Sequence, residues 1–221
     1  MKSEVRNAKS GLKTLVCFAL KEEAAPFRKL SAGRPGVSIL VSGIGRANAE
    51  KSLQAFLEEH AVARVFTCGF AGGLNPDLAL GAVVFETDVA VLREKLIAAE
   101  AKPAKFHSVP RIVTTAAEKR ELRRVTGADA VEMESEAIHA LCHKRGIPCA
   151  TVRVITDTAS EDLPLDFNQL TKSDLSLDYG KLALAVAKSP GKIGTLRRLQ
   201  KQTQFAAERL GEALAKVIWP A

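Results

Sequence analysis

The stretch Ala130-Val-Glu-Met-Glu-Ser-Glu-Ala137 places three carboxylates and a hydroxyl around one methionine. It lies where an apolar strand is expected to give way to a helix. A second apolar run, Ala150–Ile155, ends about twenty residues later at Thr156-Asp157-Thr158. In an open α/β sheet, ligands bind at the carboxyl ends of the strands. Because buried carboxylates are costly unless they are paired, both stretches indicate a site rather than a purely structural segment.

Apolar runs of strand length alternate with helical segments along the chain. The expected strands are 14–20, 37–41, 64–68, 81–88, 111–115 and 150–157, with a loop over 102–109. One expected helix opens at Lys21, another follows the acidic stretch and runs to Lys144, and the others cover 47–60, 91–102, 115–125, 177–187 and 193–217. An aromatic content of only 5% also favours this class over an all-β fold. The sequence therefore predicts an α/β fold: a single-domain three-layer sandwich, with a mostly parallel central sheet and helices on both faces.

Length and composition are those of one globular domain. At 221 residues the chain can bury a full core, and a hydrophobic content of 47% argues against disorder. Residues 1–13 are polar and basic without the apolar core of a signal peptide, so we expect a flexible tail. The domain is then 14–221, with 177–217 as its C-terminal helices. No apolar run is long enough to span a bilayer.

The cysteines show no CxxC spacing, and two of them lie in apolar, strand-like runs. They are Cys17, Cys68, Cys142 and Cys149. This pattern argues against a disulfide framework or a zinc site. Reduced, buried thiols are the better interpretation, and they predict a cytoplasmic protein without a bound metal.

The net charge of +7 is concentrated at the C-terminal end. From Lys181 onward the chain carries eight basic residues against two acids, so the remainder is close to neutral and nucleic-acid binding is not expected. The expected helix 193–217 has one apolar face and one basic face. We favour packing of the apolar face on the sheet. The alternative is peripheral docking on an anionic membrane, with Trp219 at the interface.

Two glycine-rich segments follow expected strands. Ser42-Gly-Ile-Gly-Arg46 and Gly69-Phe-Ala-Gly-Gly-Leu74 are interpreted as turns that let the backbone approach a ligand. The first is weak evidence alone, because it lacks the third glycine of a dinucleotide fingerprint and no P-loop lysine follows. Glu22 and Glu23 follow the first strand. Taken alone, they are best explained as acids that suit a helix N-terminus, although one of them projecting into a cleft is the functional alternative.

Together, these segments resemble a known superfamily. Gly43-Ile-Gly45, Gly69-Phe-Ala-Gly-Gly73 and Val131-Glu-Met-Glu-Ser135 followed by Thr156-Asp157 are similar to motifs of the purine nucleoside phosphorylases and methylthioadenosine/S-adenosylhomocysteine nucleosidases. The resemblance covers most of 14–160. The tail Pro190–Leu199 most resembles the hopanoid-associated phosphorylase branch. The resemblance implies cleavage of the N-ribosidic bond of a purine nucleoside, with adenine the expected base, by water or by phosphate as co-substrate. It implies no cofactor, and it suggests a homo-oligomer.

The resemblance also implies roles for individual residues. Glu134 would accept hydrogen bonds from the ribose 2′- and 3′-hydroxyls, and Met133 would pack on the sugar or base. Asp157 would be the general acid that protonates or hydrogen-bonds the purine N7, with a pKa raised by a dry strand end. Glu23 aligns with the water-activating glutamate of the nucleosidases. The backbone that contacts the substrate would come from Gly43, Gly45, Gly69, Phe70, Ala71 and Gly72.

Three departures from the family pattern bear on the reaction. A phenyl ring at Phe70 cannot donate to phosphate, which argues against phosphorolysis. The segment between Gly73 and Val131 is short and lacks a base-covering aromatic loop, so the pocket is expected to accept a bulky, even hopanoid-linked, 5′ substituent. No arginine matches a phosphate-binding position, and Arg28 and Arg46 are interpreted as surface residues. The alternative to an enzyme is a non-catalytic nucleoside-binding protein with a membrane-surface helix.

Overall fold

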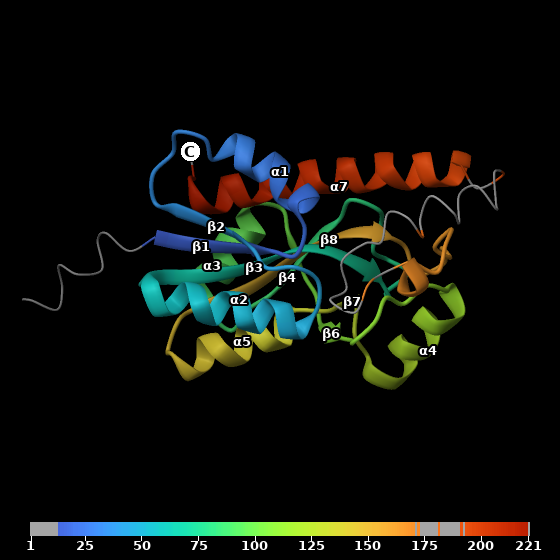
Figure 1. Cartoon of the computed structure of the whole chain (residues 1–221), viewed down its shortest axis with the longest axis horizontal. Helices are drawn as coiled ribbons and strands as arrows, with labels where there is room; N and C mark the ends of the chain where they lie inside the picture. The colour runs from blue at the N-terminus through green and yellow to red at the C-terminus, as the bar shows by residue number, and fades with distance from the viewer. Residues whose placement is uncertain (1–12, 171, 173–180, 182–190, 192, 221) are drawn as a thin grey trace, which may run out of the picture.

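The computed structural model describes residues 13–170, 172, 181, 191 and 193–220 (Figure 1). Its strands form one sheet in the order β2-β1-β3-β8-β4-β5, with β7 paired to β3 and β6 paired to β7. The strands are β1 (Lys13–Phe18), β2 (Val37–Val41), β3 (Val62–Gly73), β4 (Val83–Glu86), β5 (Lys102–Pro103), β6 (Phe106–Ser108), β7 (Ala130–Glu132) and β8 (Cys149–Asp157). Among these strands only β4 with β8 and β3 with β7 are antiparallel, which confirms the mostly parallel sheet.

Helices cover both faces of the sheet, as predicted. On one face lie α1 (Lys21–Leu30), α3 (Ala90–Ala98) and α7 (Ile193–Ile218), and on the other lie α2 (Arg46–Glu59) and α5 (Ser135–Lys144). A further helix, α4 (Ala116–Thr126), stands near β7 at the end of the sheet (Figure 1). A short 3-10 helix, η1, spans Phe167–Leu170. The apolar residues of each helix layer and the facing strand residues form two large buried clusters, which are the cores of a three-layer sandwich.

Two segments between β4 and α4 differ from prediction. Residues 102–109 are not a loop but contain β5 and β6. Residues 111–115 are not a strand, despite their β-branched side chains. There the backbone N–H and C=O of Ile112 bond to the Asn168 carboxamide, each at 2.9 Å, so one side chain replaces a neighbouring strand. Propensity favoured a strand, but the tertiary partner is a residue of the 3-10 helix η1.

The glycine-rich segment at the end of β3 also differs from prediction. It is not a turn, because β3 continues through Gly73 beside β8 and β7. Gly72 lies opposite Asp157 in the register, and a Cβ on Gly72 would stand 3.2 Å from the Asp157 Oδ2 atom. The glycines therefore make room for side chains that neighbouring strands bring to this edge.

The C-terminal helix packs as the favoured interpretation predicted. One face of the C-terminal half of α7 is buried against α1 and the sheet, and it consists of Ala206, Ala207, Leu210, Gly211, Ala213, Leu214 and Val217. The Trp219 ring stacks on Phe27, with 5.8 Å between centroids, and its Nε1–H donates to the Pro35 carbonyl at 3.3 Å. The apolar face from Ala206 to Val217 and Trp219 are thus occupied within the protein, whereas Ile193 near the start of α7 is exposed. Among the described residues, no helix is long and apolar enough to cross a membrane.

Part of the predicted organisation lies outside the described residues. This holds for the predicted tail apart from Lys13, which begins β1, and for the predicted helix 177–187 apart from Lys181.

Candidate active site

The predicted site residues meet at one edge of the sheet. Because β1, β2, β3 and β8 run parallel, their carboxyl ends lie together. Glu23 follows β1, Gly43 and Gly45 follow β2, and Gly69 to Gly72 form the end of β3. Asp157 ends β8. The strand β7 approaches the end of β3 from the opposite direction and delivers Met133 and Glu134 to the same edge.

Glu23 lies in the first turn of α1 and only 4% of it is exposed. Its Oε2 accepts the N–H groups of Ala19 (3.0 Å) and Leu20 (2.9 Å), and its Oε1 accepts the N–H of Phe70 (2.9 Å). The carboxylate therefore caps the helix and also reaches the end of β3. Burial and, to a smaller extent, the nearby Glu134 raise its pKa to about 7, against the opposing effect of the Phe70 N–H.

Gly69 lets Glu23 approach β3 closely. A Cβ at this position would lie 2.7 Å from the Glu23 Oε1 atom and 3.0 Å from the Arg153 Nη1 atom. Its φ of +153° is also one that L side chains rarely adopt. Any larger residue here would displace the two charged groups that face each other across the strand end.

Glu134 is buried and held from two sides. Its Oε1 accepts the Gly45 N–H at 2.8 Å, and its Oε2 lies 3.3 Å from Arg153 Nη2. Burial raises the pKa of Glu134, and the guanidinium opposes that shift. Gly45 is the N-cap that precedes α2, with φ +88°, and the Gly43 N–H donates to the Ala19 carbonyl at 3.1 Å. These two glycines therefore shape the edge and orient Glu134 through the backbone.

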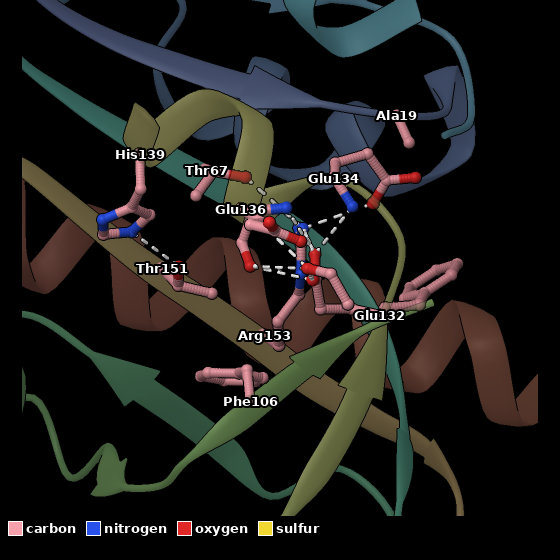
Figure 2. Close-up of polar contacts among 12 residues, drawn as sticks. Ala19, Thr67, Phe106, Glu132, Glu134, Glu136, His139, Thr151 and Arg153 are labelled. Atoms are coloured by element: carbon pink, nitrogen blue, oxygen red, sulfur yellow. Dashed lines mark hydrogen bonds and ion pairs between the residues drawn. The ribbon is translucent and has the colours of Figure 1, made fainter. Parts of the chain in front are cut away.

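Arg153 is the central cation of the site, and the sequence analysis gave it no role. It is 1% exposed in the middle of β8 and lies 2.6 Å from Glu132 Oε2 as well as near Glu134 (Figure 2). Its Nη2 also donates to the Thr67 hydroxyl at 3.3 Å, whereas its Nε has no partner in the described structure. Burial alone would lower its pKa, but the carboxylates raise it above its ordinary value. A single charge inside an otherwise apolar strand was the signal that identifies it.

The three glutamates of the acidic stretch have different environments. Glu132 accepts the backbone N–H groups of Glu134 and Ser135 and the hydroxyls of Ser108 and Ser135. Burial opposes its ionisation, but Arg153 and these donors lower its pKa to about 2. Glu132 thus fixes the turn into α5. Glu136 is exposed and pairs with Arg46, so only Glu134 faces the strand ends.

Asp157 is paired with a buried lysine that the sequence analysis also missed. Lys119 Nζ, on α4, lies 2.6 Å from Asp157 Oδ2, and the Lys119 side chain is fully buried. The other carboxylate oxygen accepts the Thr156 hydroxyl at 2.9 Å. The Asp157 side chain is 13% exposed, so it remains accessible from the edge of the sheet.

The remaining predicted contacts are apolar or backbone. Met133 and Phe70 are half-buried, and the Phe70 ring packs against the larger core cluster. Ala71 is buried. None of these side chains offers a hydrogen-bond donor. Among the described residues, the positive charge that acts on both Glu23 and Glu134 is that of Arg153.

A cavity of about 410 Å³ adjoins the serines that hold Glu132. Its lining includes Ser108, Ser135, His139 and Thr151, and His139 Nε2 lies 2.9 Å from the Thr151 hydroxyl (Figure 2). It contains no residue predicted to contact the substrate. Within the described ranges, no three His, Cys, Asp or Glu side chains are grouped to hold a metal ion.

Comparison with known proteins gives a consistent family and fold. Residues 18–97 and 91–188 match the family model described as the phosphorylase superfamily. Two relatives are 5′-methylthioadenosine/S-adenosylhomocysteine nucleosidases. The one from Shewanella oneidensis is 27% identical over 60% of this chain and 71% of its own. The one from Anoxybacillus flavithermus is 28% identical over 60% and 72%.

Solved structures resemble the whole described fold. A futalosine hydrolase of Helicobacter pylori has a TM-score of 0.70 at 16% identity, covering 95% of this chain and 98% of its own. A methylthioadenosine/S-adenosylhomocysteine nucleosidase from the same organism, solved with butyl-thio-DADMe-Immucillin-A, has a TM-score of 0.70 at 19% identity, covering 94% and 97%. At such identities these likenesses establish the fold alone.

Proposed function

The chain belongs to the phosphorylase superfamily and is an enzyme of N-glycosyl bond cleavage, and we propose that it hydrolyses the N-ribosidic bond of an adenine nucleoside. The observation that carries the proposal is Glu23. This carboxyl group is buried at the carboxyl end of β1, lies beside Glu134 and Arg153, and has a pKa of about 7. A general base is most effective when its pKa is near the working pH.

The three acids match the charges that develop during bond cleavage. Breaking the bond between C1′ and the base leaves positive charge on the sugar and an electron pair on the base, as in other glycoside cleavages. Glu134 would accept ribose hydroxyls and stabilise the cationic sugar. Glu23 would take a proton from the water whose oxygen bonds to C1′. Asp157 would pass a proton to N7 of the departing purine, and its carboxylate would then accept a hydrogen bond from that N7–H.

Electrostatics favour water over phosphate as the nucleophile. Glu23, Glu132 and Glu134 all lie near Arg153, whose Nη2 is already engaged by Glu132 and Glu134. A phosphate dianion would meet this excess of negative charge, and the one cation that the described residues place there is already paired. Phe70 provides no side-chain donor there, and Arg46 is exposed and paired with Glu136. A neutral water molecule does not meet this repulsion.

The 5′ substituent and the assembly belong to the same proposal. The named relatives support a substituted adenosine as substrate, as does the short segment between β3 and β7, which holds α3 and α4 but no long aromatic loop. A bulky group, such as a hopanoid-linked one, would suit such an open site. We expect a homo-oligomer, in keeping with the resemblance to the superfamily.

Replacing Asp157 tests the assignment of the leaving-group side. Release of free adenine from adenosine, methylthioadenosine and S-adenosylhomocysteine is expected to fall about 10²–10⁴-fold in Asp157→Asn, the usual effect of losing a general acid. Asp77→Asn, in an exposed turn, is the matched control and should retain full activity. A folded Asp157→Asn variant with normal turnover would remove this residue from the reaction.

A further inference from the structure

Lys119 uses every hydrogen-bond donor of its ammonium group inside the protein. Nζ lies 2.6 Å from Asp157 Oδ2 and donates to the carbonyls of Thr158 and Glu161, each at 2.8 Å. An ammonium has three donors and no acceptor, so none remains for a ligand. The position of Lys119 is set by α4, whose start is capped by the Thr115 hydroxyl accepting the Glu118 N–H at 3.2 Å.

A purely structural role explains only part of this arrangement. Tying the two loop carbonyls to α4 requires a hydrogen-bond donor but not a charge. Taking an ammonium fully out of water costs several kcal/mol unless an anion compensates it. The compensating anion here is Asp157, the carboxylate proposed to face the purine. Lys119 therefore acts on the chemistry of that carboxylate as well as on the loop.

The Lys119 ammonium stabilises the carboxylate that Asp157 becomes once its proton has passed to the purine N7. One oxygen of Asp157 faces Lys119, and the other accepts the Thr156 hydroxyl. An ionised carboxylate has no donor, so its remaining lone pairs can only accept hydrogen bonds from the base. A 6-aminopurine protonated at N7 offers two such donors on one edge. A 6-oxopurine offers a carbonyl oxygen at position 6, which would repel the carboxylate.

We propose that Lys119 is a positioning residue that fixes Asp157 as an acceptor and thereby gives the site its preference for 6-aminopurine over 6-oxopurine bases. This inference rests on the proposed nucleosidase function. The Lys119–Asp157 pair contributes to specificity because a carboxylate that can only accept hydrogen bonds repels a base whose position 6 carries another acceptor.

The test is the ratio of kcat/KM for adenosine over inosine in Lys119→Gln and Lys119→Arg. Glutamine keeps amide donors but removes the charge, and we expect it to lower the ratio by about tenfold or more. Arginine keeps the charge and should preserve most of the preference. Arg120→Gln, an exposed residue on the same helix, is the matched control. An unchanged ratio in a folded Lys119→Gln variant overturns the proposal, because a purely structural role would lower kcat/KM for adenosine and for inosine by the same factor.

A binding measurement tests the same preference in variants whose turnover is too slow to measure. Calorimetric titration with free adenine and with hypoxanthine should show the same loss of preference in Lys119→Gln, and an unchanged preference there also overturns the inference. The wild-type protein distinguishes a failure of the proposed function from a failure of the role of Lys119. A wild-type protein that neither cleaves nor binds either base contradicts the proposed function as well. Wild-type cleavage of adenosine with a ratio indifferent to residue 119 contradicts only the role of Lys119.

Discussion

Glu23→Gln is expected to reduce kcat/KM for an adenine nucleoside about 10²–10⁴-fold, because the variant has no base to take the proton from water. The wild-type value should rise with pH through about 7, where burial places the pKa of Glu23. The sign follows from the role: the base is active only when ionised, so activity is lost below this pKa and reaches a plateau above it. The measurement is a rate–pH profile with adenosine from pH 5 to 9.

The variant and its control separate catalysis from stability. Glutamine still accepts through its oxygen, but its amide faces one of the N–H groups of Ala19, Leu20 or Phe70, which costs about 1–3 kcal/mol. Thermal melting should therefore accompany the kinetics. Glu22→Gln changes the exposed neighbour and should leave both the rate and the profile unaltered. An acid limb near pH 7 that persists in folded Glu23→Gln would assign the base to another group.

Arg153→Met is expected to destabilise the protein by about 3–5 kcal/mol, because two buried carboxylates lose their shared cation. For a chain of this length, the expected fall in Tm is roughly 6–20 °C. Arg46→Met is the matched control: its pair with Glu136 is more than half exposed on both sides and should contribute no more than about 1 kcal/mol. Denaturant unfolding of the three proteins at pH 7 measures both differences.

The same variant has a defined pH signature. In the wild type, the lowered pKa of Glu132 contributes stability above its ordinary value of 4.5, and this contribution is lost as pH falls towards about 2. Without Arg153, only hydrogen bonds oppose the effect of burial on Glu132 and Glu134, so protonation of these carboxylates stabilises the variant. The difference in unfolding free energy between the wild type and Arg153→Met should therefore become smaller from pH 7 to pH 5. A loss of stability under 1 kcal/mol in Arg153→Met, or a stability difference that grows as the pH falls, would contradict the central role of Arg153.

The location of the site at the carboxyl edge of the sheet was predictable, because it follows from the alternation of apolar strands and helices along the sequence. Parallel strands between helices bring their carboxyl ends together, so residues following separate apolar runs were expected to meet. Glu23, Glu134 and Asp157 lie at that edge. The register of β3 was not predictable in the same way. Glycines at its end suggested a turn, but their small size serves the approach of Glu23 and Asp157 to a strand that continues.

Side-chain roles within one stretch needed the tertiary structure. Glu132, Glu134 and Glu136 alternate along the sequence, yet one holds a turn, one faces the site and one is exposed. Their partners Ser108 and Arg153 come from other strands, and no spacing rule within the stretch gives them.

The two missed cations left a weak signal in the sequence. Arg153 interrupts an apolar strand, and Lys119 lies three residues after the buried Ala116 on the inner face of α4. A charge on a buried face requires a partner. The identity of that partner depends on loops such as Thr158 to Glu161, whose path is not encoded in the helical pattern itself.

Adenine release in the absence of phosphate is the measurement that tests the hydrolytic site most directly. Purified protein, dialysed free of phosphate, is incubated with adenosine and methylthioadenosine, and free adenine and the sugar product are quantified with and without added phosphate. The arrangement of Glu23, Glu134 and Arg153 predicts equal adenine release in both cases, with free ribose or its 5′-substituted form as product. Release that requires phosphate and yields a sugar 1-phosphate would contradict it.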